Sequence, residues 1–186
     1  MSVLSLVSRS FGENPRRTGI IAKLRERGSE VSYCRWRMVL SCSRDPFCLY
    51  TGRQDLATFW ACHSAAFTHF GGVPAQVVYD RTKTVVRKHV GRGEPVELHV
   101  EALAFAAHHG FALRVCAPER PQAKGRVERM VEVTREKVAA GRDLATLEEW
   151  QAAWEAWLPH RRAQVHRTHG EVIALRAGRG RVSLPV

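Results

Sequence analysis

The sequence predicts an α/β protein in which a mixed β-sheet is covered by helices. Short apolar runs typical of buried strands alternate along the chain with longer stretches whose apolar residues recur at helical spacing. This alternation is typical of a sheet with parallel strands and helical crossovers. The 186 residues, 45% of them hydrophobic, are enough for one domain with a substantial core and a small appendage.

Residues 1–34 are expected to form a fragment resembling a helix-turn-helix, together with a linker. The basic run from Ile20 to Arg27 looks like a short helix that Gly28 would stop. Ser32 could cap a second helix. Two short helices separated by a glycine turn are the ingredients of such a motif.

Residues 35–141 are expected to form the α/β core. Two apolar runs, at 36–42 and 47–50, predict an antiparallel hairpin whose turn lies at Asp45-Pro46. Asp55 suits the start of a helix that reaches Phe70, where two glycines end it. The remaining core elements follow in order: a strand at 75–79, a helix at 97–109, a strand at 111–116 and a helix at 124–140.

Residues 142–160 are expected to form a tryptophan-rich helix that packs on the core or follows it. Trp150, Trp154 and Trp157 give this helix a strong apolar face. Thr146 and Glu149 stand at the spacing of a capping box. The last segment, residues 161–186, is a basic, glycine-rich tail without periodicity.

The charge balance points to a polyanionic partner. The formal net charge is +11 and the sequence pI is about 10.2, which favours nucleic acid first and an anionic membrane second. No apolar run is long enough to span a membrane. Residues 1–7 are mildly apolar but interrupted by serine, and they lack the order of a signal peptide. A cytoplasmic protein is therefore expected.

The cysteines, and the histidine in the apolar helix, are expected to pack in the core. The five cysteines form no CxxC pair, so neither a disulfide framework nor a zinc knuckle is indicated. His63, beside Cys62, falls in the apolar stripe of the helix at 55–70. It is expected to be a core histidine and not a metal ligand.

Two acidic residues stand where an α/β fold could bring them together. Asp80 ends a predicted strand, and Glu128, 48 residues later, lies early in the helix after the next strand. Ends of neighbouring parallel strands meet at one edge of the sheet. Two facing carboxylates would share a cation such as Mg²⁺, and two such ions could activate a phosphodiester. The alternative is an ordinary capping aspartate and a surface glutamate.

Several motifs resemble IstA-type insertion-sequence transposases. Residues 67–86, FTHFGGVPAQVVYDRTKTVV, resemble that family's second-aspartate segment, in which FGGVP is followed by YDNLK. Residues 105–111 (FAAHHGF) and 124–129 (KGRVER) are similar to its glutamate segment, and residues 38–44 (MVLSCSR) to an earlier strand. The resemblance implies a ribonuclease-H-like integrase catalytic core over residues 35–141. It further implies a strand-transfer site of the DDE class that uses Mg²⁺ or Mn²⁺.

The resemblance also implies roles for individual residues. Asp80 would be the second catalytic, metal-binding carboxylate and Glu128 the third. The basic residues expected to bind DNA surround them: Lys83, Arg120, Lys124, Arg126 and Arg129. Ordinary solvated charge is the alternative for these residues. The partners implied are the insertion-element ends and target DNA, a partner ATPase and further copies of the chain.

The sequence departs from the family at two places. Arg81 replaces the usual asparagine after the second aspartate. The family's first aspartate would fall near residue 20, yet no aspartate precedes Asp45. An internal deletion would explain this loss, so we expect a core that lacks its first strand and carries an N-terminal helical fragment.

The sequence therefore predicts a transposase-related DNA-binding protein whose strand transfer is defective because the first catalytic aspartate is missing. One alternative is a basic nucleic-acid-binding module without chemistry. A second is an active enzyme whose first aspartate comes from a partner protomer.

Overall fold

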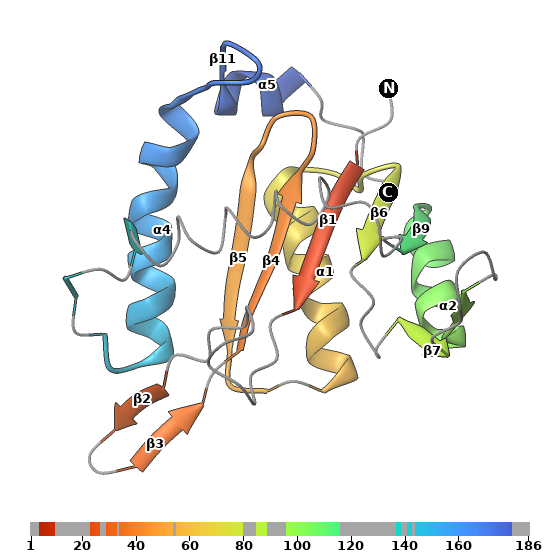
Figure 1. Ribbon diagram of the computed structural model, residues 1–186, viewed down its shortest axis with the longest axis horizontal. Coiled ribbons are helices and arrows are strands. Elements are labelled where there is room, and N and C mark those ends of the chain that lie inside the picture. Colours follow the sequence, from red (N-terminus) through yellow and green to blue (C-terminus); the bar gives the residue numbers. More distant parts are fainter. Residues whose placement is uncertain are drawn as a thin grey trace.

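The computed structural model describes residues 4–9, 23–26, 29–32, 34–53, 55–79, 85–88, 96–115, 137–138, 141–142 and 144–179. Its centre is a five-stranded mixed sheet in the order β5-β4-β1-β6-β9 (Figure 1). The strands are β1 (Leu4–Arg9), β4 (Cys34–Leu40), β5 (Pro46–Thr51), β6 (Gln76–Tyr79) and β9 (Ala112–Val115). β4 is antiparallel to β1 and β5, whereas β6 is parallel to β1 and β9. The predicted mixed α/β sheet is confirmed.

The first strand is present, which corrects the expectation of a core without it. β1 lies in the middle of the sheet, antiparallel to β4 from Ser5↔Leu40 to Arg9↔Trp36 and parallel to β6 from Leu4↔Gln76 to Val7↔Tyr79. Its serines interrupt the apolar run, so the sequence pattern did not indicate a buried strand. Pairing on both edges satisfies its backbone groups, which an irregular segment would leave open.

The expected N-terminal helical fragment is also wrong for the described residues. β2 (Lys23–Glu26) and β3 (Ser29–Ser32) form a two-stranded antiparallel sheet, with Leu24 opposite Val31. Only two residues separate the strands, the spacing of a tight hairpin turn, and a glycine is one of them. Alternation of apolar and polar residues favours the strand pair over two very short helices.

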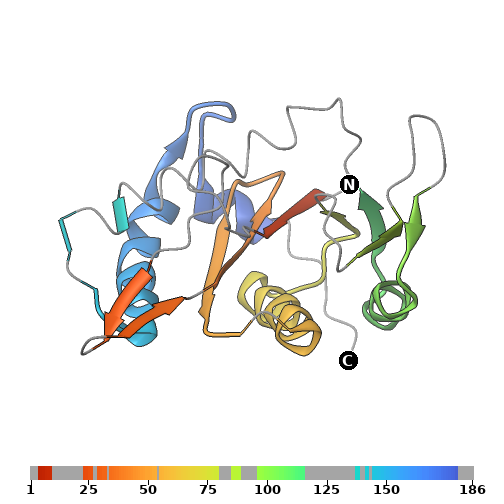
Figure 2. The ribbon, with the colours of Figure 1, turned by 60° about the horizontal axis from the view of Figure 1, so that its bottom comes forward.

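One face of the sheet is covered by α1 (Leu56–Phe70) and α2 (Val100–His109) (Figures 1 and 2). The Asp55 carboxylate accepts a 2.7 Å hydrogen bond from the Thr58 amide at the α1 start. Gly71 ends the helix in the left-handed region, with φ 69°, which is open to glycine at little cost. The main core therefore lies between α1 and alternate residues of the sheet: Trp36, Met38, Phe47, Val77 and Tyr79.

A second apolar cluster lies on the opposite face, under α4 (Leu147–Ala163). Trp154 is 1% exposed and packs with Val39, Cys48 and Tyr50 of the sheet. The predicted capping box is confirmed, because Thr146 accepts from the Glu149 amide and Glu149 accepts from the Thr146 amide. The buried Val138 joins the same cluster, whereas the rest of the helix predicted at residues 124–140 lies outside the described residues.

The C-terminal part is more ordered than its composition indicates. α4 continues past Pro159, and a hairpin of β10 (Val165–His166) and β11 (Glu171–Val172) leads into α5 (Ile173–Arg179). The buried Ile173 and Ala177 anchor α5. At the other end of the sheet, β7 (Val86–Lys88) pairs with β8 (Glu97–Leu98), so α2 begins three residues later than predicted.

Candidate functional site

The residues predicted to carry the chemistry lie outside the described part of the chain. These are the carboxylates Asp80 and Glu128 and the basic residues Lys83, Arg120, Lys124, Arg126 and Arg129. The structure does describe the strands that lead to them. Their roles therefore remain predictions.

The scaffold is the edge of the sheet where the parallel strands end. Tyr79, the last residue of β6, is level with Val7 of β1 and with Val115 of β9. Asp80 follows Tyr79 in the sequence, and Glu128 belongs to the segment that follows β9. Carboxyl ends of parallel strands are where α/β sheets place their ligands. That both carboxylates meet at this edge remains a prediction from the sequence.

The β1 strand passes this edge without an acidic residue. Its sequence is LSLVSR. Val7 is level with Tyr79, the residue that precedes Asp80 in the sequence. In the antiparallel direction, Ser8 is paired with Arg37 of β4. The residue that follows Val7 on β1 is therefore a serine paired with an arginine, and not a carboxylate.

Arg37 is the residue at this edge that sequence reasoning missed. Its side chain is completely buried, although it is charged at any physiological pH. Trp36 and Met38 face α1, so strand alternation places Arg37 on the opposite face with Val39 and Cys48. The sequence contained one signal for this residue. The apolar run WRMVL includes a single cation, and the hairpin has no exposed face that would explain its presence.

His63 supports β6 from the α1 side. Its Nδ1 lies 2.8 Å from the Phe59 carbonyl oxygen, and its ring contacts Trp36 and Tyr79. Burial lowers the His63 pKa to about 3, against a smaller opposing effect of that hydrogen bond. Burial likewise raises the pKa of Tyr79. The ring is thus neutral, in agreement with a core histidine.

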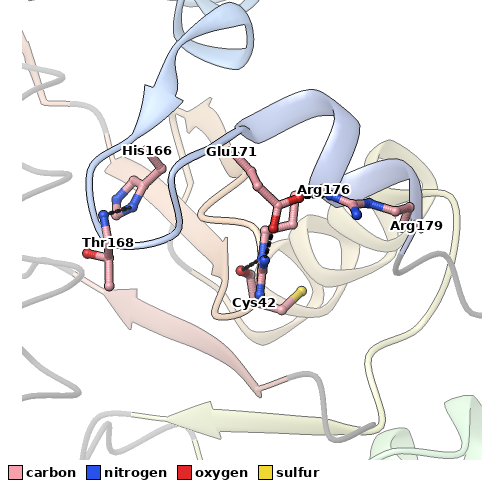
Figure 3. Close-up of polar contacts among 6 residues, drawn as sticks. All are labelled: Cys42, His166, Thr168, Glu171, Arg176 and Arg179. Carbon is pink, nitrogen blue, oxygen red and sulfur yellow. Dashed lines mark hydrogen bonds and ion pairs between the residues drawn. The ribbon is translucent and has the colours of Figure 1, made fainter.

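The β4–β5 turn is fixed by arginines from the C-terminal part. Arg162 of α4 forms a 3.1 Å ion pair with Asp45, whose side chain is 2% exposed. Arg176 of α5 donates a 2.6 Å hydrogen bond from Nε to the Cys42 carbonyl (Figure 3). Glu171 pairs with both Arg176 and Arg179, and the Thr168 amide donates to His166 Nδ1. Part of the basic tail therefore holds the core together.

Within the described residues, no group of three or more histidine, cysteine, aspartate or glutamate side chains could hold a metal ion, and Asp80 and Glu128 are not among them. Cys48 and Cys62 are buried and Cys42 is half-buried. None of the described helices combines the length and the apolar character needed to cross a bilayer.

Comparison with known proteins places these features in context. Residues 22–121 match the family model described as "Integrase core domain". A transposase for insertion sequence element IS5376 from Geobacillus stearothermophilus is 32% identical over 132 residues, which are 70% of this chain and 32% of that protein. A transposase for insertion sequences IS1326/IS1353 from Pseudomonas aeruginosa is 34% identical over 110 residues, which are 59% of this chain and 21% of that protein.

Among solved structures, the HTLV-2 integrase catalytic core domain in complex with magnesium has a similar fold. The TM-score is 0.59 at 11% sequence identity, and the similarity covers 94% of this chain and 95% of that one. The expected ribonuclease-H-like integrase core is therefore confirmed as the fold. The chain spans about a third or less of the length of the curated transposases it matches.

Proposed function

Because this chain belongs to the integrase core domain family and is similar to insertion-sequence transposases, we propose that it is a DNA-binding protein of the DDE class with a defective strand-transfer centre. The observation that supports the proposal is the position and composition of strand β1. This strand holds the middle of the sheet, and its residues LSLVSR include no carboxylate. The defect is then a changed residue at the site and not a missing strand.

The metal chemistry of the class would need a further acidic ligand beside Asp80 and Glu128, and β1 supplies none. Asp80 and Glu128 are the residues that would hold Mg²⁺ or Mn²⁺. Two hard cations near each other are normally balanced by several carboxylates. Here β1 carries no carboxylate, and the neighbouring strand β4 adds the buried guanidinium of Arg37. The residues present do not fit a two-metal centre, and we derive no reaction step through one.

DNA binding remains as the activity. The net charge of +11 provides long-range attraction to phosphate. The local contacts would come from Lys83 and from the cluster of Arg120, Lys124, Arg126 and Arg129 around Glu128. Insertion-element ends and target DNA are the proposed ligands. A partner ATPase, homo-oligomers and a cytoplasmic location follow from the same assignment.

The test compares binding with cleavage on the same DNA. The purified chain is titrated into a fluorescein-labelled duplex at several salt concentrations, and nicking of a supercoiled plasmid is measured in Mn²⁺. We expect salt-dependent binding without nicking above the level of an Asp80→Asn/Glu128→Gln variant. Nicking that this variant loses would refute the defective centre.

A second candidate is a basic nucleic-acid-binding module in which the two carboxylates have no role. The charge alone favours it. Asp80→Asn and Glu128→Gln distinguish the two candidates, because a module without a site predicts unchanged stability on removing either carboxylate. Energetic coupling between these carboxylates and other groups of the sheet edge would favour the first candidate, the remnant of a catalytic centre.

A further inference from the structure

We propose that the C-terminal part of the chain carries a further DNA-binding surface, which contacts the phosphate backbone of duplex DNA. The last turn of α4, the β10–β11 hairpin and α5 form this C-terminal arginine surface, and its cations are Arg161, Arg162, Arg167, Arg176 and Arg179. The inference rests on the proposed function for its ligand. It goes further by assigning DNA contacts to another place in the fold.

The C-terminal arginine surface lies at the end of the sheet where the parallel strands begin. Arg162 and Arg176 are fixed on the β4–β5 turn by the ion pair and the hydrogen bond described above. That turn follows Leu40, which is paired with Ser5 near the start of β1. Tyr79 is level with the later part of β1, where β6 ends. The surface is therefore at the opposite end of the parallel strands from Tyr79 (Figure 1).

Arginines outnumber carboxylates on this surface. Residues 160–179 contain five arginines and a single carboxylate, Glu171. Glu171 pairs with both Arg176 and Arg179, so one carboxylate faces two guanidinium groups (Figure 3). Arginines remain in excess when Asp45 of the β4–β5 turn is included. An excess of this kind attracts polyanions over about 10 Å at moderate salt.

Two of the arginines present this charge to solvent. Arg167 is exposed at the tip of the hairpin, next to the exposed Thr168. Arg179 is two-thirds exposed although it is paired with Glu171. A guanidinium can donate two parallel hydrogen bonds to phosphate oxygens, and threonine hydroxyls also contact the DNA backbone. Arg167, Thr168 and Arg179 are therefore the groups that we expect to touch DNA.

The tip of the hairpin is held in one shape by its own backbone. The amides of His169 and Gly170 both donate to the His166 carbonyl oxygen, at 3.0 and 2.9 Å. The Thr168 amide donates to His166 Nδ1 at 3.2 Å (Figure 3). Gly170 has a φ of 66°, a conformation that glycine adopts at little cost. Because the tip is already ordered, binding does not have to pay for ordering it.

An anionic membrane and an acidic protein are the other partners that positive charge could attract. Helices that bind membrane surfaces add a broad apolar face to their cations, and protein interfaces have an apolar centre. The large apolar side chains exposed near the arginines are Val165 and Leu175, which lie on different elements. Single exposed apolar residues are ordinary on protein surfaces. The composition of the surface therefore favours the phosphate backbone.

The test measures binding of a fluorescein-labelled duplex by anisotropy at increasing NaCl. Arg167→Gln/Arg179→Gln should weaken binding at least about tenfold at about 0.1 M salt and reduce the slope of log Kd against log salt by about 2. Arg162 and Arg176 stay unchanged, because they hold the fold together.

The charge-matched control is Arg53→Gln/Arg142→Gln, which removes two exposed arginines that precede α1 and α4. It should change the affinity and the slope much less than the hairpin variant. Equal effects of the two double variants would overturn the proposal, because the net charge alone would then explain the loss.

A conservative variant separates charge from packing. Arg167→Lys/Arg179→Lys should keep the salt slope, because lysine also neutralises a phosphate. A loss as large as that of the glutamine variant would overturn the proposal. So would phosphatidylserine vesicles that bind through Arg167 and Arg179 while DNA does not.

The same titrations separate this inference from the proposed function. Failure of the unmodified chain to bind duplex DNA would contradict the proposed function. Unchanged binding by Arg167→Gln/Arg179→Gln, together with weaker binding by Lys124→Gln/Arg126→Gln, would contradict the C-terminal arginine surface alone.

Discussion

Arg162 of α4 and Asp45 of the β4–β5 turn form an ion pair of 3.1 Å in which the carboxylate is almost entirely buried and the arginine is about one-third exposed. The pair joins the C-terminal end of α4 to the β4–β5 hairpin at one edge of the central sheet. Because of this pair, part of the segment that the sequence predicts to be a basic tail belongs to the core. Its removal therefore affects stability before it affects DNA binding.

We expect Arg162→Met to lower the free energy of unfolding by about 3 kcal/mol at pH 7, because it leaves the buried Asp45 carboxylate without this partner. Urea denaturation followed by tryptophan fluorescence measures the change. Arg167→Met, at an exposed position of the β10–β11 turn, is the control and should stay within about 0.5 kcal/mol. Equal effects of the two variants would show that the ion pair does not stabilise the fold.

Trp154 is the centre of the cluster between α4 and the sheet, with 1% of its side chain exposed. Trp154→Ala should cost about 4 kcal/mol, through the lost apolar burial and the cavity that remains. The half-buried Trp157, which contacts Trp154 at a ring distance of 5.2 Å, offers a comparison on the same helix. Trp157→Ala should cost clearly less in the same urea titration, and the reverse order would place the packing centre elsewhere.

His63 predicts a specific pH dependence of stability. Its pKa falls from 6.5 to about 3 on folding, chiefly through burial. Between these values the unfolded chain binds the proton and the folded chain does not, so the stabilisation is complete above about pH 6.5 and declines as the pH falls toward 3. The slope contributed is at most about 1.4 kcal/mol per pH unit.

His63→Phe should remove most of this slope, as measured by urea denaturation between pH 4 and 7. Some slope will remain, because burial also lowers the pKa of His69 and His109. Ser64→Ala, on the exposed side of α1, serves as control and should leave the slope as it is. A slope that survives His63→Phe unchanged would mean that the buried imidazole does not control acid stability.

The basic cluster around Glu128 predicts how DNA binding responds to salt. Neutralising Lys124 or Arg126 should weaken binding to all duplex sequences alike and reduce the slope of log Kd against log salt by about 1. Fluorescence anisotropy at increasing NaCl gives that slope. Ser64→Ala, on the exposed side of α1, is the neutral control. A loss confined to one DNA sequence would indicate base contacts in place of phosphate contacts.

The sequence reveals elements whose signals are local. Asp55, Gly71, Thr146 and Glu149 sit at helix ends, and their roles depend on neighbours within a few residues, so these helix starts and stops could be predicted. The fold class also followed, because strands and helices alternate along the whole core.

Features that depend on distant partners could not be predicted in the same way. β1 pairs with strands that begin about 30 and 70 residues later, and nothing within LSLVSR announces them. The burial of Arg37 depends on the assembled sheet, in which β1 pairs beside β4. α5 is stabilised by two buried apolar residues and by Arg176, whose hydrogen-bond acceptor lies 134 residues away. Helix and strand signals are local, whereas register and burial are set by the assembled sheet.

The central place of β1 has a consequence for how the molecule is made. During synthesis this strand leaves the ribosome before either of its neighbours, and its second edge stays open until Gln76–Tyr79 of β6 has emerged. Unpaired strand edges invite pairing with other chains. The sheet is thus completed only by a long-range contact, and the second edge of β1 is a potential site for pairing with other chains until β6 is in place.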